Sequence, residues 1–193
     1  MLVDTPGYDG PGNGQGFGPF LGEIEKADLI LLVCSARMAS RKPDHDFLRA
    51  VREWFQERPD RKMPPIIVVG SFIDELRSRH EWNPPYRWDS TQKQENLSPK
   101  EQALRLFLEV LRRDLELAPH ELVIPVCSHP ERVWNVAEGL APAIAAHWAE
   151  ARAVRDNRHL QTHQRKRHRL LLQQVKNTAG LAVRLTLKKI GLG

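Results

Sequence analysis

The sequence has few cysteines and no long apolar run, and both absences narrow the class of protein. Only Cys34 and Cys127 occur among its 193 residues, which excludes a disulfide-stabilised secreted scaffold. Both lie inside apolar runs, a placement that predicts buried thiols in a reducing compartment. No apolar stretch approaches the roughly 18 residues that a spanning helix needs, and no signal peptide is visible at Met1. We therefore expect a cytoplasmic protein.

The net charge of +5 hides a strong asymmetry along the chain. Residues 151–193 contain eleven Lys/Arg and one acid, whereas residues 1–150 contain 18 basic and 23 acidic residues. The densest basic cluster consists of Arg165, Lys166, Arg167 and Arg169, and an apolar helical stripe from Leu171 to Ile190 follows it. This pattern predicts a helical arm that touches an anionic partner, either a membrane surface or RNA. A solvated run of charge is the alternative.

Apolar runs alternate with helical patterns over the first 150 residues. Four short runs predict strands, the second of them covered on both faces: Met1–Asp4, Leu29–Cys34, Ile66–Val69 and Leu122–Val126. Helices are expected from Pro43, from a capping box at Ser98, and from Val136 to about Arg152, while the glycine-rich stretch Thr5–Gly22 predicts a loop. This alternation is typical of an α/β domain with a mostly parallel sheet.

The ends of three predicted strands carry residues with chemical potential. Asp4-Thr5-Pro6-Gly7 ends the first run, and an Asp with Gly three residues later can place a carboxylate near a nucleotide's magnesium ion and an amide near its γ-phosphate. Ser71-Phe72-Ile73-Asp74 ends the third run. Cys127-Ser128 follows the fourth. Any one of these strings alone also fits an ordinary turn at a strand end.

Together, in this order and spacing, the strings resemble the later motifs of Era-like GTPases, a branch of the translation-factor class. The resemblance implies a three-layer P-loop NTPase-like fold that binds GTP and Mg²⁺, the ion being held indirectly through Asp4. It implies that Asp74 accepts hydrogen bonds from guanine N1 and N2, and that backbone at Cys127 and Ser128 contacts guanine O6. Ser71 and Phe72 stand at guanine-binding positions where the family's pattern has Asn/Thr and Lys. The resemblance implies that the Lys covers the base, and the Phe72 ring could still stack on it.

The phosphate-binding string Gly-x-x-x-x-Gly-Lys-Ser/Thr is absent from the sequence, as is the upstream switch threonine. We therefore expect residues 1–150 to be a GTPase domain incomplete at its N-terminus, with residues 151–193 as the arm. The complete protein would couple GTP hydrolysis to a conformational switch, and the isolated chain should bind GTP poorly or not at all. The alternative is a pseudo-GTPase interaction module whose arm binds a membrane, RNA or a protein effector.

Overall fold

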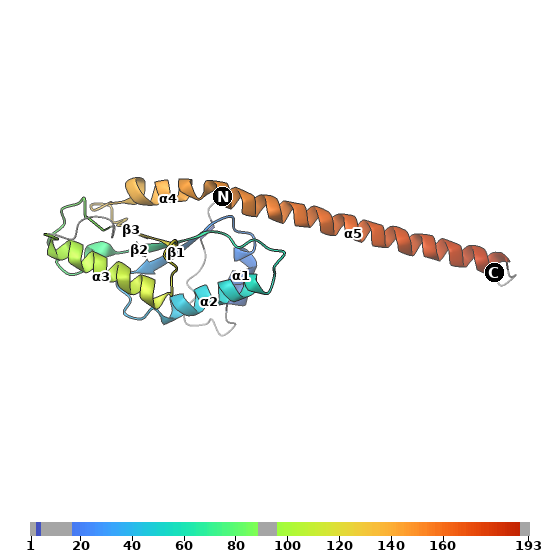
Figure 1. Ribbon diagram of the computed structural model, residues 1–193, viewed down its shortest axis with the longest axis horizontal. Coiled ribbons are helices and arrows are strands. Elements are labelled where there is room, and N and C mark those ends of the chain that lie inside the picture. Colours follow the sequence, from blue (N-terminus) through green and yellow to red (C-terminus); the bar gives the residue numbers. More distant parts are fainter. Residues whose placement is uncertain (1–2, 5–16, 89–95, 190–193) are drawn as a thin grey trace.

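The computed structural model describes residues 3–4, 17–88 and 96–189, with side chains up to Gln173 on the last helix (Figure 1). It is an α/β fold in which helices flank a three-stranded parallel sheet, as the sequence predicted. The strands are β1 (Ile30–Ser35), β2 (Ile66–Ser71) and β3 (Leu122–Pro125), and they lie side by side in that order. The strands are parallel, so the carboxyl ends of all three lie along the same side of the sheet.

Helices cover the two faces of the sheet unequally. α1 (Gly18–Ile24), α2 (Lys42–Gln56) and α3 (Pro99–Asp114) pack on the face that carries Leu32 and Val68. α3 approaches so closely that a Cβ at Gly70 would lie 2.8 Å from the Phe107 ring, which explains a glycine inside a buried strand. The opposite face, with Ile67 and Val69, packs against Ala143 of the short helix α4 (Ala141–Ala146).

Strand β1 corrects one expectation. The continuous apolar run at Leu29–Cys34 predicted a strand buried on both faces, yet the Val33 side chain is 58% exposed. Among the described residues β1 pairs only with β2, so it forms an edge of the sheet. Leu32 and Cys34 are buried on the other face, because α1 and α2 cover that face of the strand.

The described part of the N-terminal segment also differs from expectation. Val3 and Asp4 are exposed, and neither belongs to a strand. The strand predicted at Met1–Asp4 is therefore wrong for these two residues, because no described strand pairs with them. The glycine-rich loop predicted up to Gly22 ends earlier, because α1 begins at Gly18 with proline in its first turn. Burial of Phe20 and Ile24 stabilises this helix despite its glycines.

Helix α3 begins as the sequence predicted. The Ser98 side chain accepts a hydrogen bond from the Glu101 amide, and the Glu101 carboxylate accepts one from the Ser98 amide. The helix predicted from Val136 to about Arg152 is instead divided. A π-helical turn at Val136–Leu140 leads into α4, and a new helix, α5 (Trp148–Lys189), begins two residues after α4 ends.

Helix α5 is 42 residues long and projects well beyond the body of the molecule (Figure 1). Its first turns belong to the core, because Ala151 and Val154 are buried. All described side chains from Thr162 to Gln173 are exposed, and within this range Arg165 still reaches the body through an ion pair with Asp60. The helical arm was predicted. None of the described helices combines the length and hydrophobicity needed to cross a membrane.

Candidate functional site

The carboxyl ends of β2 and β3 bring together residues that are far apart in the sequence. Ser71 ends β2, and Phe72 and Asp74 lie in the following turn, where a 3₁₀ helix spans Ile73–Glu75. Cys127 and Ser128 follow β3. The Cys127 thiol contacts Asp74, with Sγ 3.4 Å from Oδ1. Ligands of parallel α/β sheets bind at this kind of edge.

Asp74 is a buried carboxylate with few hydrogen-bond donors. Only 7% of the residue is exposed, and among the described residues the Cys127 thiol is the one side chain that donates to it. Burial raises the pKa of this thiol, which keeps it protonated as a weak donor. A carboxylate offers about four acceptor positions, and buried acceptors are normally satisfied. Asp74 therefore has acceptor capacity that no described side chain other than Cys127 uses.

Ser128 presents the complementary group. It is exposed, and no hydrogen bond of the described residues uses its backbone amide, although the flanking Cys127 amide donates to Trp134 O at 3.1 Å. Asn135 supports this turn, because its side-chain amide donates to Pro125 O at 2.7 Å. The edge of the sheet thus offers an acceptor at Asp74 and a donor at Ser128.

Lys100, which the sequence did not single out, holds the Asp74 turn in place. Its side chain is 2% exposed, and its ammonium group donates to Asp74 O at 2.9 Å and Leu76 O at 3.0 Å. Burial lowers its pKa, and the charge of Asp74 opposes that shift. A charged residue in the first turn of a helix is usually solvated, so the sequence carried no signal of this role.

The loop that follows the turn is fastened to α3 by ionic and aromatic contacts. Arg87 Nε lies 3.0 Å from Glu101 Oε1, and the Arg87 amide donates to the same oxygen at 2.9 Å. The Tyr86 ring packs edge-on between Trp82 and Trp134, with centroid distances of 5.5 and 5.3 Å. These aromatic side chains therefore form a structural support behind the site.

Ser71 joins the ends of β1 and β2. Its hydroxyl donates to Cys34 O at 3.4 Å, and its carbonyl accepts from the Ala36 amide at 2.8 Å. Ser71 is only 8% exposed, so its hydroxyl faces the protein. The side chain thus has a structural role in the structure described here.

The first predicted motif is not brought to this edge by the described residues. Asp4 is exposed and takes no part in the sheet, and Thr5, Pro6 and Gly7 lie outside the described residues. Within the described ranges, no group of three or more His, Cys, Asp or Glu side chains could hold a metal ion. The assignment of Mg²⁺ to Asp4 therefore stays a prediction.

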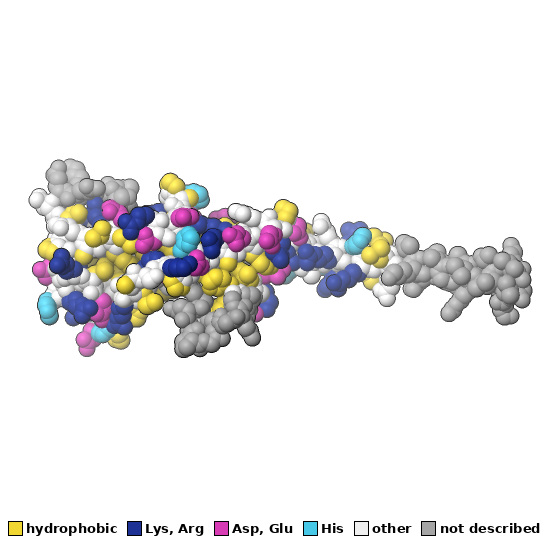
Figure 2. All heavy atoms as spheres, turned by 90° about the horizontal axis from the view of Figure 1, so that it is seen from below, with side chains coloured by type: hydrophobic (Ala, Val, Ile, Leu, Met, Phe, Trp, Pro, Cys, Tyr) yellow, Lys and Arg dark blue, Asp and Glu magenta, His cyan; other side chains and the backbone are white. Residues whose placement is uncertain are grey.

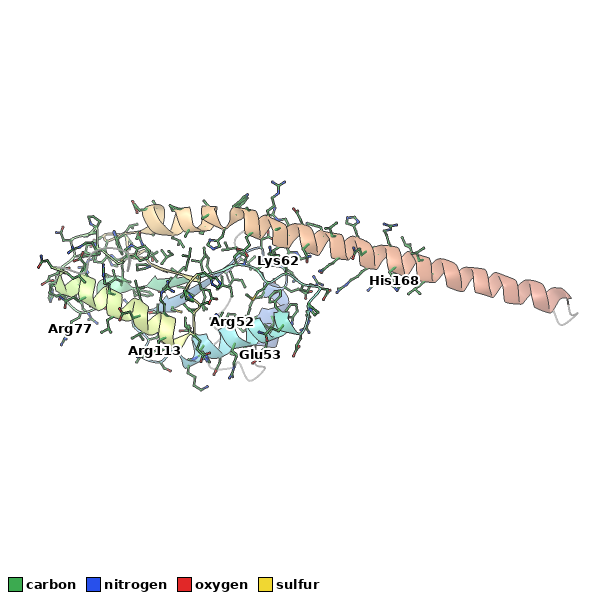
Figure 3. All side chains as sticks on the ribbon, viewed as in Figure 1. Arg52, Glu53, Lys62, Arg77, Arg113 and His168 are labelled. Carbon is green, nitrogen blue, oxygen red and sulfur yellow. The ribbon has the colours of Figure 1, made fainter. Side chains whose placement is uncertain are left out.

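The basic cluster Arg165–Arg169 lies on α5, away from the strand ends. Figure 3 labels Arg77, which follows the Asp74 turn, at the end of the body far from the arm, and His168 part-way along the arm. Arg165, Lys166, Arg167 and Arg169 are all exposed. Arg165 pairs with Asp60 at 3.1 Å, so part of its charge is already engaged.

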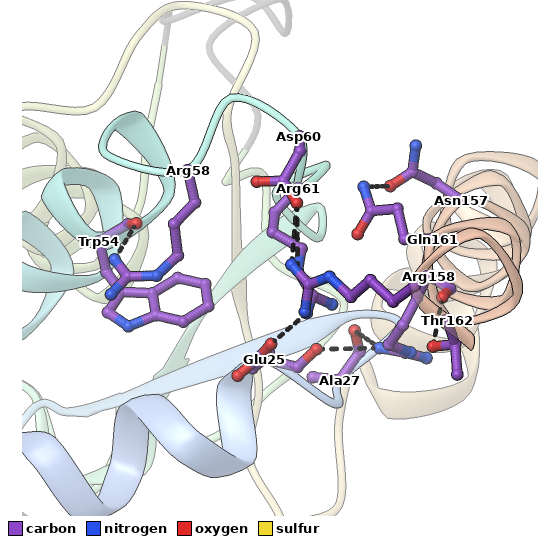
Figure 4. Close-up of polar contacts among 11 residues, drawn as sticks. Glu25, Ala27, Trp54, Arg58, Asp60, Arg61, Asn157, Arg158, Gln161 and Thr162 are labelled. Atoms are coloured by element: carbon purple, nitrogen blue, oxygen red, sulfur yellow. Dashed lines mark hydrogen bonds and ion pairs between the residues drawn. The ribbon is translucent and has the colours of Figure 1, made fainter. Parts of the chain in front are cut away.

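Arginines at the root of α5 fix the direction of the arm (Figure 4). Arg158 donates to Ala27 O at 3.0 Å and pairs with Asp28, and Arg155 pairs with the same carboxylate at 2.9 Å. Asp28 precedes β1, so these contacts lie near the amino ends of the strands. The arm therefore leaves the body near the amino ends of the strands, whereas Asp74 and Ser128 lie at their carboxyl ends.

Two hollows lie elsewhere on the surface. One of about 240 Å³ is lined by Trp148, Arg152, Arg155 and Asp156 of α5, and another lies beside α2. The first has a single helix as its described wall, and Arg155 is already paired with Asp28. Neither hollow borders the strand ends, where the Asp74 carboxylate and the Ser128 amide lie. We therefore place the candidate site at Asp74 and Ser128.

The fold defines a small α/β domain with a three-stranded parallel sheet and a long C-terminal helix. No family model, curated protein or solved structure matches the chain. Its functional assignment therefore rests on the chemistry of its own residues.

Proposed function

We propose that the body of this chain is a guanine-nucleotide-binding domain of the Era-like GTPase type. The observation that carries the proposal is the carboxylate of Asp74, which accepts one described side-chain hydrogen bond, near the exposed Ser128, whose amide no described hydrogen bond uses. The two groups come from turns that follow neighbouring parallel strands. Such a pair can recognise a ligand that presents donors and an acceptor along one edge.

Guanine has this pattern. Its N1–H and N2–H groups would donate to the two carboxylate oxygens of Asp74, and its O6 would accept from the Ser128 amide. Adenine presents an acceptor at N1 and a donor at N6, so these two contacts would become repulsive, and its C2–H cannot replace the hydrogen bond of guanine N2. Hydrogen bonds to a charged group contribute about 1.5–3 kcal/mol each. The pair would therefore discriminate strongly between the two purines.

The phosphate end of the proposed site rests on the resemblance of the sequence. Asp4, Thr5, Pro6 and Gly7 would serve Mg²⁺ and the γ-phosphate, where the metal would offset the negative charge that develops during GTP hydrolysis. The printed sequence has no phosphate-binding string. The base contacts at Asp74 and Ser128 alone should therefore give weak binding, in the millimolar range typical of a few hydrogen bonds.

Titration of the ¹⁵N-labelled chain with guanosine and adenosine monophosphates tests the proposal. We expect GMP to shift the amide signals of Ser128 and of the Asp74 turn, and AMP to leave them unchanged at equal concentration. Asp74→Ala should abolish the GMP response, while Asp60→Ala, an acid-to-alanine control near the opposite sheet edge, should preserve it. Equal responses to GMP and AMP, or none to either, would contradict the proposal.

The arm favours a second, separate activity, which is binding to an anionic membrane surface. Figure 2 shows Lys and Arg side chains on the described part of the arm beyond the body. Three consecutive leucines follow the cluster, and Leu170, Leu171 and Leu172 are 59, 57 and 49% exposed. Basic side chains beside exposed leucines suit the boundary between lipid headgroups and acyl chains.

Co-sedimentation with vesicles tests this second activity. Each basic residue near an anionic surface contributes about 1 kcal/mol, so replacing all four with alanine should weaken binding at low salt by roughly a hundredfold or more. The four residues are Arg165, Lys166, Arg167 and Arg169. The matched control removes equal charge from exposed positions of the body: Arg49, Lys62, Arg77 and Arg113. Equal losses in both variants, or binding to RNA but not to vesicles, would refute the membrane assignment.

A further inference from the structure

Phe72 adopts an unusual conformation at the edge of the candidate site. Its backbone has φ 56° and ψ 35°, the left-handed region that side chains other than Gly, Asn and Asp rarely occupy. The residue is 43% exposed, so burial of the ring does not offset the strain. Strained non-glycine residues in turns at ligand-binding edges often serve a function. Asp74 lies only two residues further on.

The Phe72 ring is held by a side chain from the neighbouring strand end. The Arg37 guanidinium carbon lies 4.1 Å from the ring centroid, the geometry of a stacked cation–π contact. Arg37 Nη2 also lies 2.7 Å from Glu75 Oε1, and Arg79 Nη2 lies 3.3 Å from Glu75 Oε2. Arg37 follows β1 and Glu75 follows β2, so the ion pair between them joins the two strand ends beside the Phe72 ring.

We propose that Phe72 is the stacking platform for the base of the bound nucleotide, and that Arg37 is a positioning residue that orients the ring. This inference rests on the proposed function of the site. A carboxylate hydrogen-bonds a base in the plane of its rings, whereas an aromatic ring contacts it across its face. Asp74 and Phe72 can therefore act on one base without competing. Asp74 selects the base, and Phe72 contributes affinity that every base shares.

The two contributions separate experimentally, because stacking does not depend on which groups the base carries. Removal of an aromatic platform weakens base binding on the order of tenfold. Phe72→Leu should therefore weaken GMP binding about tenfold, while the preference for GMP over AMP persists. Phe72→Tyr keeps the ring and should preserve both quantities. Phe72 is exposed, so these variants should retain the amide spectrum of the folded body.

Ring-current shifts of the GMP H8 proton provide a readout that a purely structural role would not change. In complex with the unaltered chain, H8 should shift upfield, and Phe72→Leu should abolish the shift. Arg37→Ala should reduce it, and Arg37→Lys, which retains a cation above the ring, should restore part of it. Glu75→Gln should give an intermediate reduction, because Arg37 loses its ionic anchor.

The outcomes distinguish this inference from the proposed function. Selective GMP binding without an upfield H8 shift, or with full affinity in Phe72→Leu, would overturn the platform and leave the role of Asp74 intact. An unchanged H8 shift in Arg37→Ala would overturn the positioning role. Failure of the unaltered chain to bind any nucleotide would overturn both proposals.

Discussion

Glu101 joins the first turn of α3 to the loop that follows the candidate site. Its carboxylate accepts from Arg87 Nε at 3.0 Å and from the Ser98 amide at 2.8 Å, and the residue is only 6% exposed. The Arg87 side chain is the main cause that lowers the pKa of Glu101 from 4.5 to about 2. Glu101→Gln removes the charge and keeps a side chain of the same size.

The pKa shift sets the size and the pH range of the expected effect. A carboxyl group whose pKa is lowered on folding stabilises the folded state above its unfolded pKa. This contribution is lost as the pH falls from 4.5 toward about 2. The shift corresponds to about 3 kcal/mol at neutral pH. Glu101→Gln should therefore lower the free energy of unfolding by up to about 3 kcal/mol at pH 7, and by much less near pH 2.5.

Urea denaturation followed by circular dichroism at several pH values measures this difference. The unaltered chain and Glu101→Gln should converge in stability between pH 4.5 and 2.5. Glu116→Gln, an exposed acid on the turn after α3, is the control and should differ little from the unaltered chain at any pH. A destabilisation by Glu101→Gln that stays constant from pH 7 to pH 2.5 would refute the reasoning.

Two further predictions concern the Phe72 turn and the root of the arm. Phe72→Gly should be about 1 kcal/mol more stable than Phe72→Ala in urea denaturation, because only glycine adopts this φ without strain; equal stabilities would contradict the strain. Asp28→Ala removes the carboxylate that pairs with both Arg155 and Arg158, so hydrogen exchange should accelerate in the first turns of α5 and remain slow in β2. Unchanged exchange in α5 would show that its buried side chains alone hold the arm.

The sequence predicted the parallel sheet because its local signals were strong. Apolar runs near Leu29, Ile66 and Leu122 are short and bounded by polar segments, and the helix after Ser98 has its start encoded in a capping box. The motif order also predicted that Asp4, Asp74 and Ser128 would lie along one edge, since carboxyl ends of parallel strands share an edge. The contact of Asp74 with Cys127, the residue before Ser128, agrees with this for two of the three, whereas Asp4 takes no part in the described sheet.

Other features depend on which neighbours are present, and composition does not reveal them. Val33 is exposed because β1 lies at an edge of the described sheet. The apolar run Leu29–Cys34 has the same sequence pattern as a strand with neighbours on both sides. Lys100 is buried because two carbonyl groups lie within its reach, and Arg37 gains its role from a ring on the next strand end. Such contacts join positions that no local pattern connects.

Replacement of Asp74 by asparagine tests the central claim most directly. Guanine offers N1–H and N2–H to a carboxylate, whereas xanthine offers N1–H beside a carbonyl oxygen, which the amide of asparagine can complement. The unaltered chain should therefore respond to GMP and not to xanthosine monophosphate in the amide titration, and Asp74→Asn should reverse this preference. Loss of both responses without reversal, or an unchanged preference for GMP, would contradict base recognition by Asp74.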